Sequence, residues 1–142
     1  MLEAKDWDCF HLGAVHAACV RHLEEQAAAG HPWSKHASVS ALFQSIKGGK
    51  VGAVITGGYL LVYDYGPTLY SYQPILIEHL VIKLRPQGAG DFNAVTQALD
   101  ELARRHGCVG IFTGNAVGRA GLTRLYERSG FHQVTVGLYK EM

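Results

Sequence analysis

A short glycine-rich turn at residues 87–90 lies between an apolar segment and an amphipathic one. Its members are Gln87, Gly88, Ala89 and Gly90. Glycine lets the backbone approach a ligand closely, and the free N–H groups of a first helical turn attract anions. We therefore expect a site for a phosphate-bearing ligand here, completed by Asp91, Phe92 and Asn93. Such a turn alone is weak evidence, because a plain strand-to-helix connection also uses glycine.

A second pattern lies at residues 125–131, where the sequence reads Leu-Tyr-Glu-Arg-Ser-Gly-Phe. Together the two patterns resemble the GNAT superfamily of N-acetyltransferases. That family has a Gln/Arg-x-x-Gly-x-Gly/Ala turn after its fourth strand and a Leu-Tyr-x-x-x-Gly-Phe box on its last helix. The box matches completely from Leu125 to Phe131, and one helix and one strand separate it from the turn. The resemblance covers roughly residues 51–142, and the first fifty residues carry no diagnostic motif.

The turn aligns with the family pattern in two registers. Starting at Arg85 matches it letter for letter, whereas starting at Gln87, which we favour, keeps the flanking strand and helix in step. In the favoured register Phe92 stands where the family prefers Gly or Ala. A second departure is Arg119, at a position where the family often has an Asn facing the pantetheine arm, and Asn115 is nearby but out of register. The resemblance thus places Arg119 beside the coenzyme.

The resemblance implies an acetyl-CoA-dependent N-acetyltransferase that moves the acetyl group from the coenzyme thioester directly to an amine in a ternary complex. It implies that backbone N–H groups at Leu80, Val81 and Ile82 polarise the thioester carbonyl, where a bulge opens the strand ladder. It also implies that Tyr126 faces the coenzyme sulfur. A phenol with a pKa near 10 can donate a proton to a thiolate at neutral pH. A buried Tyr with a satisfied hydroxyl is the other interpretation.

The incoming amine must lose a proton, and Glu78 is our candidate base. It lies in an otherwise apolar strand, where burial raises the pKa of a carboxyl group towards neutrality. The rival base is His79, whose ordinary pKa is more convenient. Strand alternation predicts that His79 faces away from the side shared by Leu76, Glu78, Leu80 and Ile82. The alternative role for Glu78 is a structural ion pair with a Lys or Arg.

The acceptor is not defined by the sequence. A protein N-terminus, a lysine side chain, a polyamine and a small amine all fit, so the acceptor is a small molecule or a protein or peptide. Trp33 could enclose it, although covering the edge of the core is the commoner role of Trp. The eight histidines form no H-x-x-x-H or H-E-x-x-H pattern, so we expect no metal site.

The elements that must position these residues follow from hydrophobic periodicity. Helical spacing predicts helices over 8–29, 34–47, 92–105 and 118–129. Apolar or alternating runs predict strands over 51–56, 59–65, 75–84, 109–113 and 131–140. The order, helix–helix–three strands–helix–strand–helix–strand, predicts an α/β domain with a central mixed sheet flanked by helices. The family usually begins with a strand, which here is expected to be short or missing.

Composition limits the remaining functions. A chain of 142 residues with 48% apolar and 18% charged residues predicts one soluble domain spanning 1–142. A net charge of +1 argues against nucleic-acid binding. Three cysteines without C-x-x-C spacing indicate free thiols, and no segment resembles a signal peptide or membrane span. We expect a cytoplasmic monomer or homodimer with no membrane partner.

Two rival functions stay open at this stage. The first is a non-catalytic binding or structural protein built on the same scaffold, such as an inhibitor or a particle component, which the departures at Phe92 and Arg119 favour. The second is an unrelated α/β nucleotide binder. The sequence has no Gly-Lys-Ser/Thr and no full Gly-x-Gly-x-x-Gly with a following acid, so the second rival ranks low.

Overall fold

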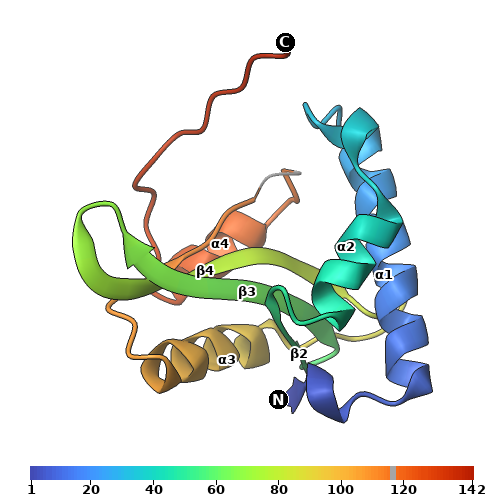
Figure 1. Cartoon of the computed structure of the whole chain (residues 1–142), viewed down its shortest axis with the longest axis horizontal. Helices are drawn as coiled ribbons and strands as arrows, with labels where there is room; N and C mark the ends of the chain where they lie inside the picture. The colour runs from blue at the N-terminus through green and yellow to red at the C-terminus, as the bar shows by residue number, and fades with distance from the viewer. Residues whose placement is uncertain (116–117) are drawn as a thin grey trace.

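A five-stranded mixed sheet with helices on both faces forms the protein in the computed structural model, which describes residues 1–115 and 118–142 (Figure 1). The strands, which are adjacent in sequence order, are β1 (Leu2–Glu3), β2 (Gly52–Thr56), β3 (Tyr59–Thr68), β4 (Ser71–Lys83) and β5 (Ile111–Phe112). The first four pair antiparallel, and β5 runs parallel to β4. The predicted α/β class is confirmed, and the expected short first strand is present as β1.

The helices cover the two faces of the sheet in pairs. They are α1 (Cys9–Ala28), α2 (Val39–Lys47), α3 (Phe92–Arg105) and α4 (Leu122–Arg128), with 3-10 helices at Ala4–Asp6 and Ser34–His36. Residues of α1 and α2, such as Val15 and Ile46, pack against Leu60 and Val62 of β3. On the other face α3 packs Leu99 and its neighbours against Leu61, and α4 adds Tyr126 to the same cluster.

Capping residues fix where the helices begin. The Asp8 carboxylate accepts from the N–H of His11 at the start of α1, and the Asp91 carboxylate caps α3 as predicted. The predicted helix 34–47 is interrupted, because the side chain of Ser38 caps a new helix, α2. The last helix begins at Leu122 instead of residue 118. The preceding Gly121 has a left-handed φ of +79°, which a continuous helix does not allow.

The β3–β4 hairpin is longer than predicted. The expected end of β3 at residue 65 and the expected start of β4 at residue 75 are wrong, since Pro67 pairs with Pro74 and the strands turn only after Thr68. β2 pairs with β3 only as far as Tyr63, so Pro67 lies on a free edge where its missing N–H breaks no ladder.

A bulge in β4 interrupts the alternation of faces that the sequence predicted. Val62 pairs with Leu80, but the next residue, Tyr63, pairs with Glu78, so His79 is an extra residue in β4. Glu78 therefore lies on the α3 face with Leu76, while Leu80 belongs to the core under α1 and α2, as does Ile82. The prediction of one shared face for these residues is wrong, because period-two alternation assumes an unbroken ladder.

The predicted strand 131–140 does not form. Its segment leaves α4, stands away from the sheet and ends near the connection between α1 and α2 (Figure 1). Val134, Val136 and Leu138 alternate as predicted, yet they are 67%, 71% and 95% exposed. The neighbouring β5 spans only two residues, so it offers this segment little ladder to pair with.

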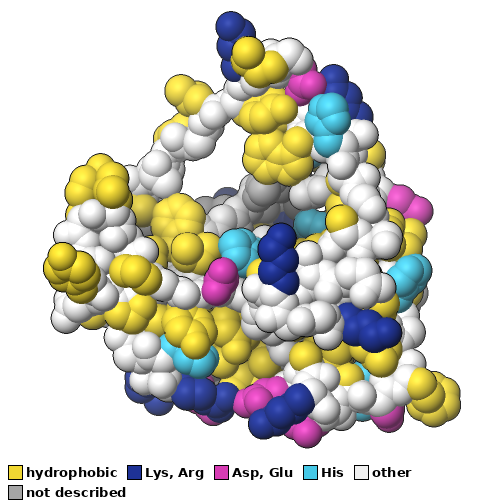
Figure 2. Space-filling model, viewed as in Figure 1, with side chains coloured by type: hydrophobic (Ala, Val, Ile, Leu, Met, Phe, Trp, Pro, Cys, Tyr) yellow, Lys and Arg dark blue, Asp and Glu magenta, His cyan; other side chains and the backbone are white. Residues whose placement is uncertain are grey.

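The end of this segment instead contacts the loop before α2. The ring of Tyr139 meets Trp33 edge-on at 5.3 Å, and Glu141 forms ion pairs with Lys35 at 2.7 Å and His36 at 3.3 Å. Trp33 thus packs beside the C-terminal segment and remains half exposed. Figure 2 shows this face of the molecule, with a hollow between the C-terminal segment and the helices.

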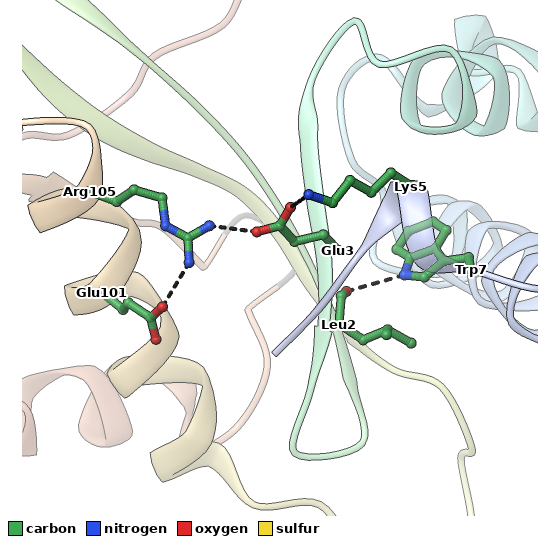
Figure 3. A network of polar contacts seen from close by, with 6 residues as sticks. All are labelled: Leu2, Glu3, Lys5, Trp7, Glu101 and Arg105. Carbon is green, nitrogen blue, oxygen red and sulfur yellow. Dashed lines mark hydrogen bonds and ion pairs between the residues drawn. The ribbon is translucent and has the colours of Figure 1, made fainter.

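A polar network joins the N-terminus to α3 (Figure 3). Glu3 of β1 pairs with Lys5 at 3.2 Å and with Arg105 at 2.6 Å, and Arg105 also pairs with Glu101 at 2.7 Å. The indole N–H of Trp7 donates to the Leu2 carbonyl at 3.2 Å. These contacts hold the two-residue β1 on the edge of the sheet.

Two predictions about the chain as a whole can be compared with the fold. Cys9, Cys19 and Cys108 are free thiols, as expected. Within residues 1–115 and 118–142, no helix combines the length and the apolar character needed to cross a membrane.

Candidate functional site

The site is built where β4 and β5 separate. β5 pairs with β4 only at Leu76 and Ile77, so in the described part of the chain the β4 edge beyond that point has no strand beside it. A pocket of about 370 Å³, here called the fork pocket, opens along this edge. Val81 and Ile82 of β4, Phe92 of α3 and Leu122 of α4 contribute to its walls. Of the three β4 residues predicted at the coenzyme, Leu80 is turned into the other core.

Glu78 and Tyr126 meet at the base of the fork. The Tyr126 hydroxyl donates to the Glu78 carboxylate at 3.0 Å, although the two residues are 48 positions apart. Glu78 is only 9% exposed and Tyr126 only 4%. The backbone N–H of Gly114, just beyond β5, also favours the charged form of this carboxylate. The tertiary structure therefore brings together the two predicted catalytic residues in a buried hydrogen bond.

Burial controls the protonation of this pair. It raises the pKa of Glu78 to about 7, although the hydrogen bonds from Tyr126 and Gly114 and the charge of Arg119 act in the opposite direction. The pKa of Tyr126 is raised well above its ordinary value, first by burial and then by the neighbouring Glu78. At neutral pH Tyr126 therefore keeps its proton, while Glu78 can be in either state.

Packing around the pair fixes the phenol ring. Phe92 meets Tyr126 edge-on with ring centroids 5.2 Å apart, and Phe131 packs at 5.1 Å. The predicted departure at Phe92 thus has a structural role, since its ring supports Tyr126. His79, the rival base, is exposed at the bulge, and no hydrogen bond in the described structure joins it to Glu78.

The glycine turn leaves fewer free N–H groups than predicted. Gly88 donates to the Arg85 carbonyl at 3.1 Å, and Asp91 donates to Gly57 at 2.9 Å. The N–H of Asn93 donates to the Asp91 carboxylate, which caps α3. Among residues 88–93, the N–H groups of Ala89, Gly90 and Phe92 have no partner within the described structure. These three are the donors available to an anion at the start of α3.

Tight packing explains why Gly90 is glycine. A Cβ atom there would lie 2.6 Å from the ring of Tyr59, and the Tyr59 ring also meets Phe92 edge-on. Gly57, with a φ of +55°, lies against the backbone of Asp91. The turn therefore packs against the β2–β3 hairpin, and its glycines serve this packing in addition to any role in ligand binding.

Arg21 is a residue of the fork pocket that the sequence analysis missed. One of its guanidinium nitrogens, Nη2, donates to the carbonyls of Lys83 at 2.8 Å and Leu84 at 2.9 Å. In the described part of the chain neither Arg21 nor Lys83 forms an ion pair with an acid. An Arg on a long exposed helix has no sequence signature of this role, because only the tertiary fold brings α1 to the end of β4.

Arg119 crosses the fork pocket. Its guanidinium donates to the Val81 carbonyl of β4 and to the Glu25 carboxylate of α1, from Nε at 3.1 Å and from Nη2 at 2.8 Å. Asn115 holds the backbone of Arg119 on both sides, accepting from its N–H at 2.8 Å and donating to its carbonyl at 2.9 Å. Asn115 therefore positions Arg119 and does not itself line the fork pocket.

A second pocket, of about 570 Å³, lies between β5, α4 and residues 131–135. Tyr126 lines this pocket and not the fork pocket, so α4 separates the two cavities. No cluster of three or more potential metal ligands occurs in residues 1–115 and 118–142.

Solved structures share this architecture. A protein described as a probable acetyltransferase superposes with a TM-score of 0.62 at 12% identity, over 95% of this chain and 97% of that one. An acetyltransferase of Trypanosoma brucei gives 0.55 at 15% identity, over 89% and 94%. A transcriptional regulator from Bacillus halodurans gives 0.59 at 20% identity, also over 89% and 94%. No family model and no curated protein matches the sequence. The chain thus has a fold found in acetyltransferases, and a fold alone does not assign an activity.

Proposed function

We propose that this protein is an acetyl-CoA-dependent N-acetyltransferase. The observation that carries the proposal is the buried Glu78–Tyr126 hydrogen bond at the fork between β4 and β5. It unites a carboxyl group with a pKa of about 7 and a phenol that keeps its proton. A base and an acid poised in this way suit a reaction that takes a proton from one substrate and gives one to another.

The coenzyme would bind in the fork pocket. Its pyrophosphate would meet the N–H groups of Ala89, Gly90 and Phe92 at the start of α3, where the helix dipole favours an anion. The cations of Arg21 and Lys83 support the same assignment. The pantetheine arm would run along the unpaired edge of β4 at Val81 and carry the thioester past Phe92, which lines the fork pocket and contacts the Tyr126 ring.

The transfer itself would use Glu78 and Tyr126 in sequence. The amine nitrogen attacks the thioester carbonyl, the C–N bond forms, and Glu78 takes the proton that the nitrogen loses. The C–S bond then breaks, and Tyr126 gives its proton to the leaving thiolate. The phenol has one proton, and in the structure this proton is donated to Glu78. Once Glu78 is protonated, it can donate to the phenol oxygen, so the phenol proton is free to move to the sulfur. Tyr126 then receives the Glu78 proton, and both groups return to their starting protonation states.

Isothermal titration with acetyl-CoA tests the coenzyme site. We expect saturable binding to the wild type and none to Gly88→Arg, whose side chain would fill the turn. Gly88 is a better choice than Gly90, because a side chain at Gly90 would also displace Tyr59. Equal thermal stability of the two proteins is the control for folding. If the wild type does not bind, or the variant binds equally well, the coenzyme site is wrongly assigned.

An acceptor screen tests the activity. Purified protein is incubated with acetyl-CoA and panels of small amines, polyamines and peptides, and thiol release is measured. Release that depends on an amine supports the proposal. Coenzyme binding without transfer to any amine would favour the non-catalytic alternative.

A further inference from the structure

We propose that Glu25 limits the affinity of the fork pocket by competing with the phosphate groups of the coenzyme for Arg119. In this proposal Arg119 bridges Val81 and Glu25 across the pocket in the free protein, and a phosphate-bearing ligand takes over the guanidinium. The inference rests on the proposed coenzyme function and assigns a role to Glu25, which no motif indicated.

The first step is the position of the bridge. β5 leaves β4 after Ile77, so the Val81 carbonyl lies on a strand edge with no strand beside it. Such an edge is where an extended ligand with amide groups can pair with a protein backbone. The guanidinium of Arg119 already donates to this carbonyl. A ligand that pairs with this edge at Val81 therefore competes with Arg119 for the carbonyl.

The second step concerns which part of Arg119, its backbone or its side chain, can move. Asn115 holds the backbone of Arg119 with two hydrogen bonds, of 2.8 and 2.9 Å. Among residues 1–115 and 118–142, the Arg119 side chain bonds only to the Val81 carbonyl and to the Glu25 carboxylate. Releasing Arg119 from the bridge thus needs a rotation of its side chain, while its backbone can stay bonded to Asn115.

The third step is the balance of charges. The side chains of Glu25 and Arg119 are 48% and 30% exposed, and ion pairs this open to water contribute little to stability. The phosphate groups of coenzyme A together carry more charge than one carboxylate, and a phosphate can bind a guanidinium through two oxygens, whereas Glu25 accepts both of its bonds at Oε2. Glu25 is also the only acidic residue that lines the fork pocket within the described chain, beside the cations of Arg21 and Lys83. A phosphate can therefore replace Glu25 as the partner of Arg119, but Glu25 competes with it for the same guanidinium.

Isothermal titration with coenzyme A tests this competition. The proteins compared are the wild type, Glu25→Gln, Arg119→Ala and the double variant. We expect Glu25→Gln to bind about three- to fivefold more tightly, because an exposed ion pair is worth up to about a factor of five in an equilibrium. In the Arg119→Ala background the same change is expected to leave the affinity within about twofold.

A neighbouring acid provides the matched control. Glu24 is exposed on α1 and forms no ion pair in the described part of the chain, so Glu24→Gln removes the same charge without touching the bridge. We expect it to change the affinity by less than about twofold, since solvent screens exposed charges.

The outcomes separate this inference from the coenzyme proposal. Unchanged or weaker binding by Glu25→Gln, beside normal binding by the wild type, overturns the competition alone. An equal gain in the Arg119→Ala background also overturns it, because the gain would then be simple charge repulsion. Tight binding by Glu25→Gln and none by the wild type supports both proposals. If no variant binds coenzyme A, both proposals are wrong.

Discussion

Glu78 shows how one buried side chain can couple folding to pH. Its pKa is about 7 in the folded protein and 4.5 in an exposed carboxyl group. Between these values the folded protein holds a proton that the unfolded chain has lost. Raising the pH through this window therefore favours the unfolded chain, and the contribution of Glu78 to stability decreases until about pH 7.

Glu78→Gln should remove this pH dependence. The free energy of unfolding of the wild type, relative to that of the variant, is expected to fall by roughly 3 kcal/mol between pH 4.5 and pH 7, the equivalent of the pKa shift. Urea unfolding at several pH values measures it. Tyr126 and Arg119 are the ionisable groups that act on Glu78, and the raised pKa of Tyr126 keeps its proton in place over this range. A difference between the two proteins that is constant with pH would contradict the assigned pKa.

Tyr126→Phe separates the hydroxyl from the ring. Loss of the hydroxyl leaves the buried Glu78 carboxylate with one donor fewer, so we expect about 1–3 kcal/mol of destabilisation at pH 8 and less at pH 5.5, where Glu78 is protonated. Denaturant unfolding at both pH values measures this difference. If the proposed mechanism is right, turnover falls much more than coenzyme affinity. An unchanged rate would remove Tyr126 from the chemistry and leave it a packing residue.

At the scale of elements, the glycine turn before α3 joins two parts of the fold. It docks on the β2–β3 hairpin through Gly57 and Asp91, and Gly90 leaves room for the Tyr59 ring. Tyr59 and Phe92 then support the wall of the fork pocket. A ligand site and a structural contact thus share one short segment.

Gly90→Ala should reveal the structural contact. A Cβ atom 2.6 Å from the Tyr59 ring forces a shift, and we expect a loss of about 1–3 kcal/mol in the free energy of unfolding. In a Tyr59→Leu background the same change should cost less, because the ring is gone. Chemical denaturation of the four proteins measures the coupling. Equal costs in both backgrounds would show that Tyr59 is not the obstacle.

At the scale of the whole molecule, the C-terminal segment is the part least integrated with the sheet. No backbone hydrogen bond outside helices and strands is donated by residues 132–142 in the described structure, and no strand includes them. We expect their amides to exchange with solvent much faster than those of β3 and β4. Hydrogen exchange followed by mass spectrometry measures it. Protection at residues 132–138 would mean that this segment joins the sheet.

Local sequence patterns predicted several elements well. The α3 boundaries follow from its apolar stripe and from Asp91, and the hairpin turn follows from Gly57 and Gly58. The resemblance implied a bulge near residues 80–82, but local patterns predicted neither its position at His79 nor the unpaired segment 131–140. Both depend on which strand lies alongside, and a strand's own residues do not specify its neighbour.

The candidate site likewise combines local patterns that the sequence shows and contacts that only the fold creates. The sequence by itself determined the glycine turn, the Leu-Tyr-x-x-x-Gly-Phe box and the acid in an apolar strand, because each is a pattern of neighbouring residues. Only the tertiary structure decided that Glu78 bonds to Tyr126 and that Arg119 bridges Val81 and Glu25. These partners are 38 to 94 residues apart, and their contact depends on where β4 and β5 separate and on how the helices pack around that fork.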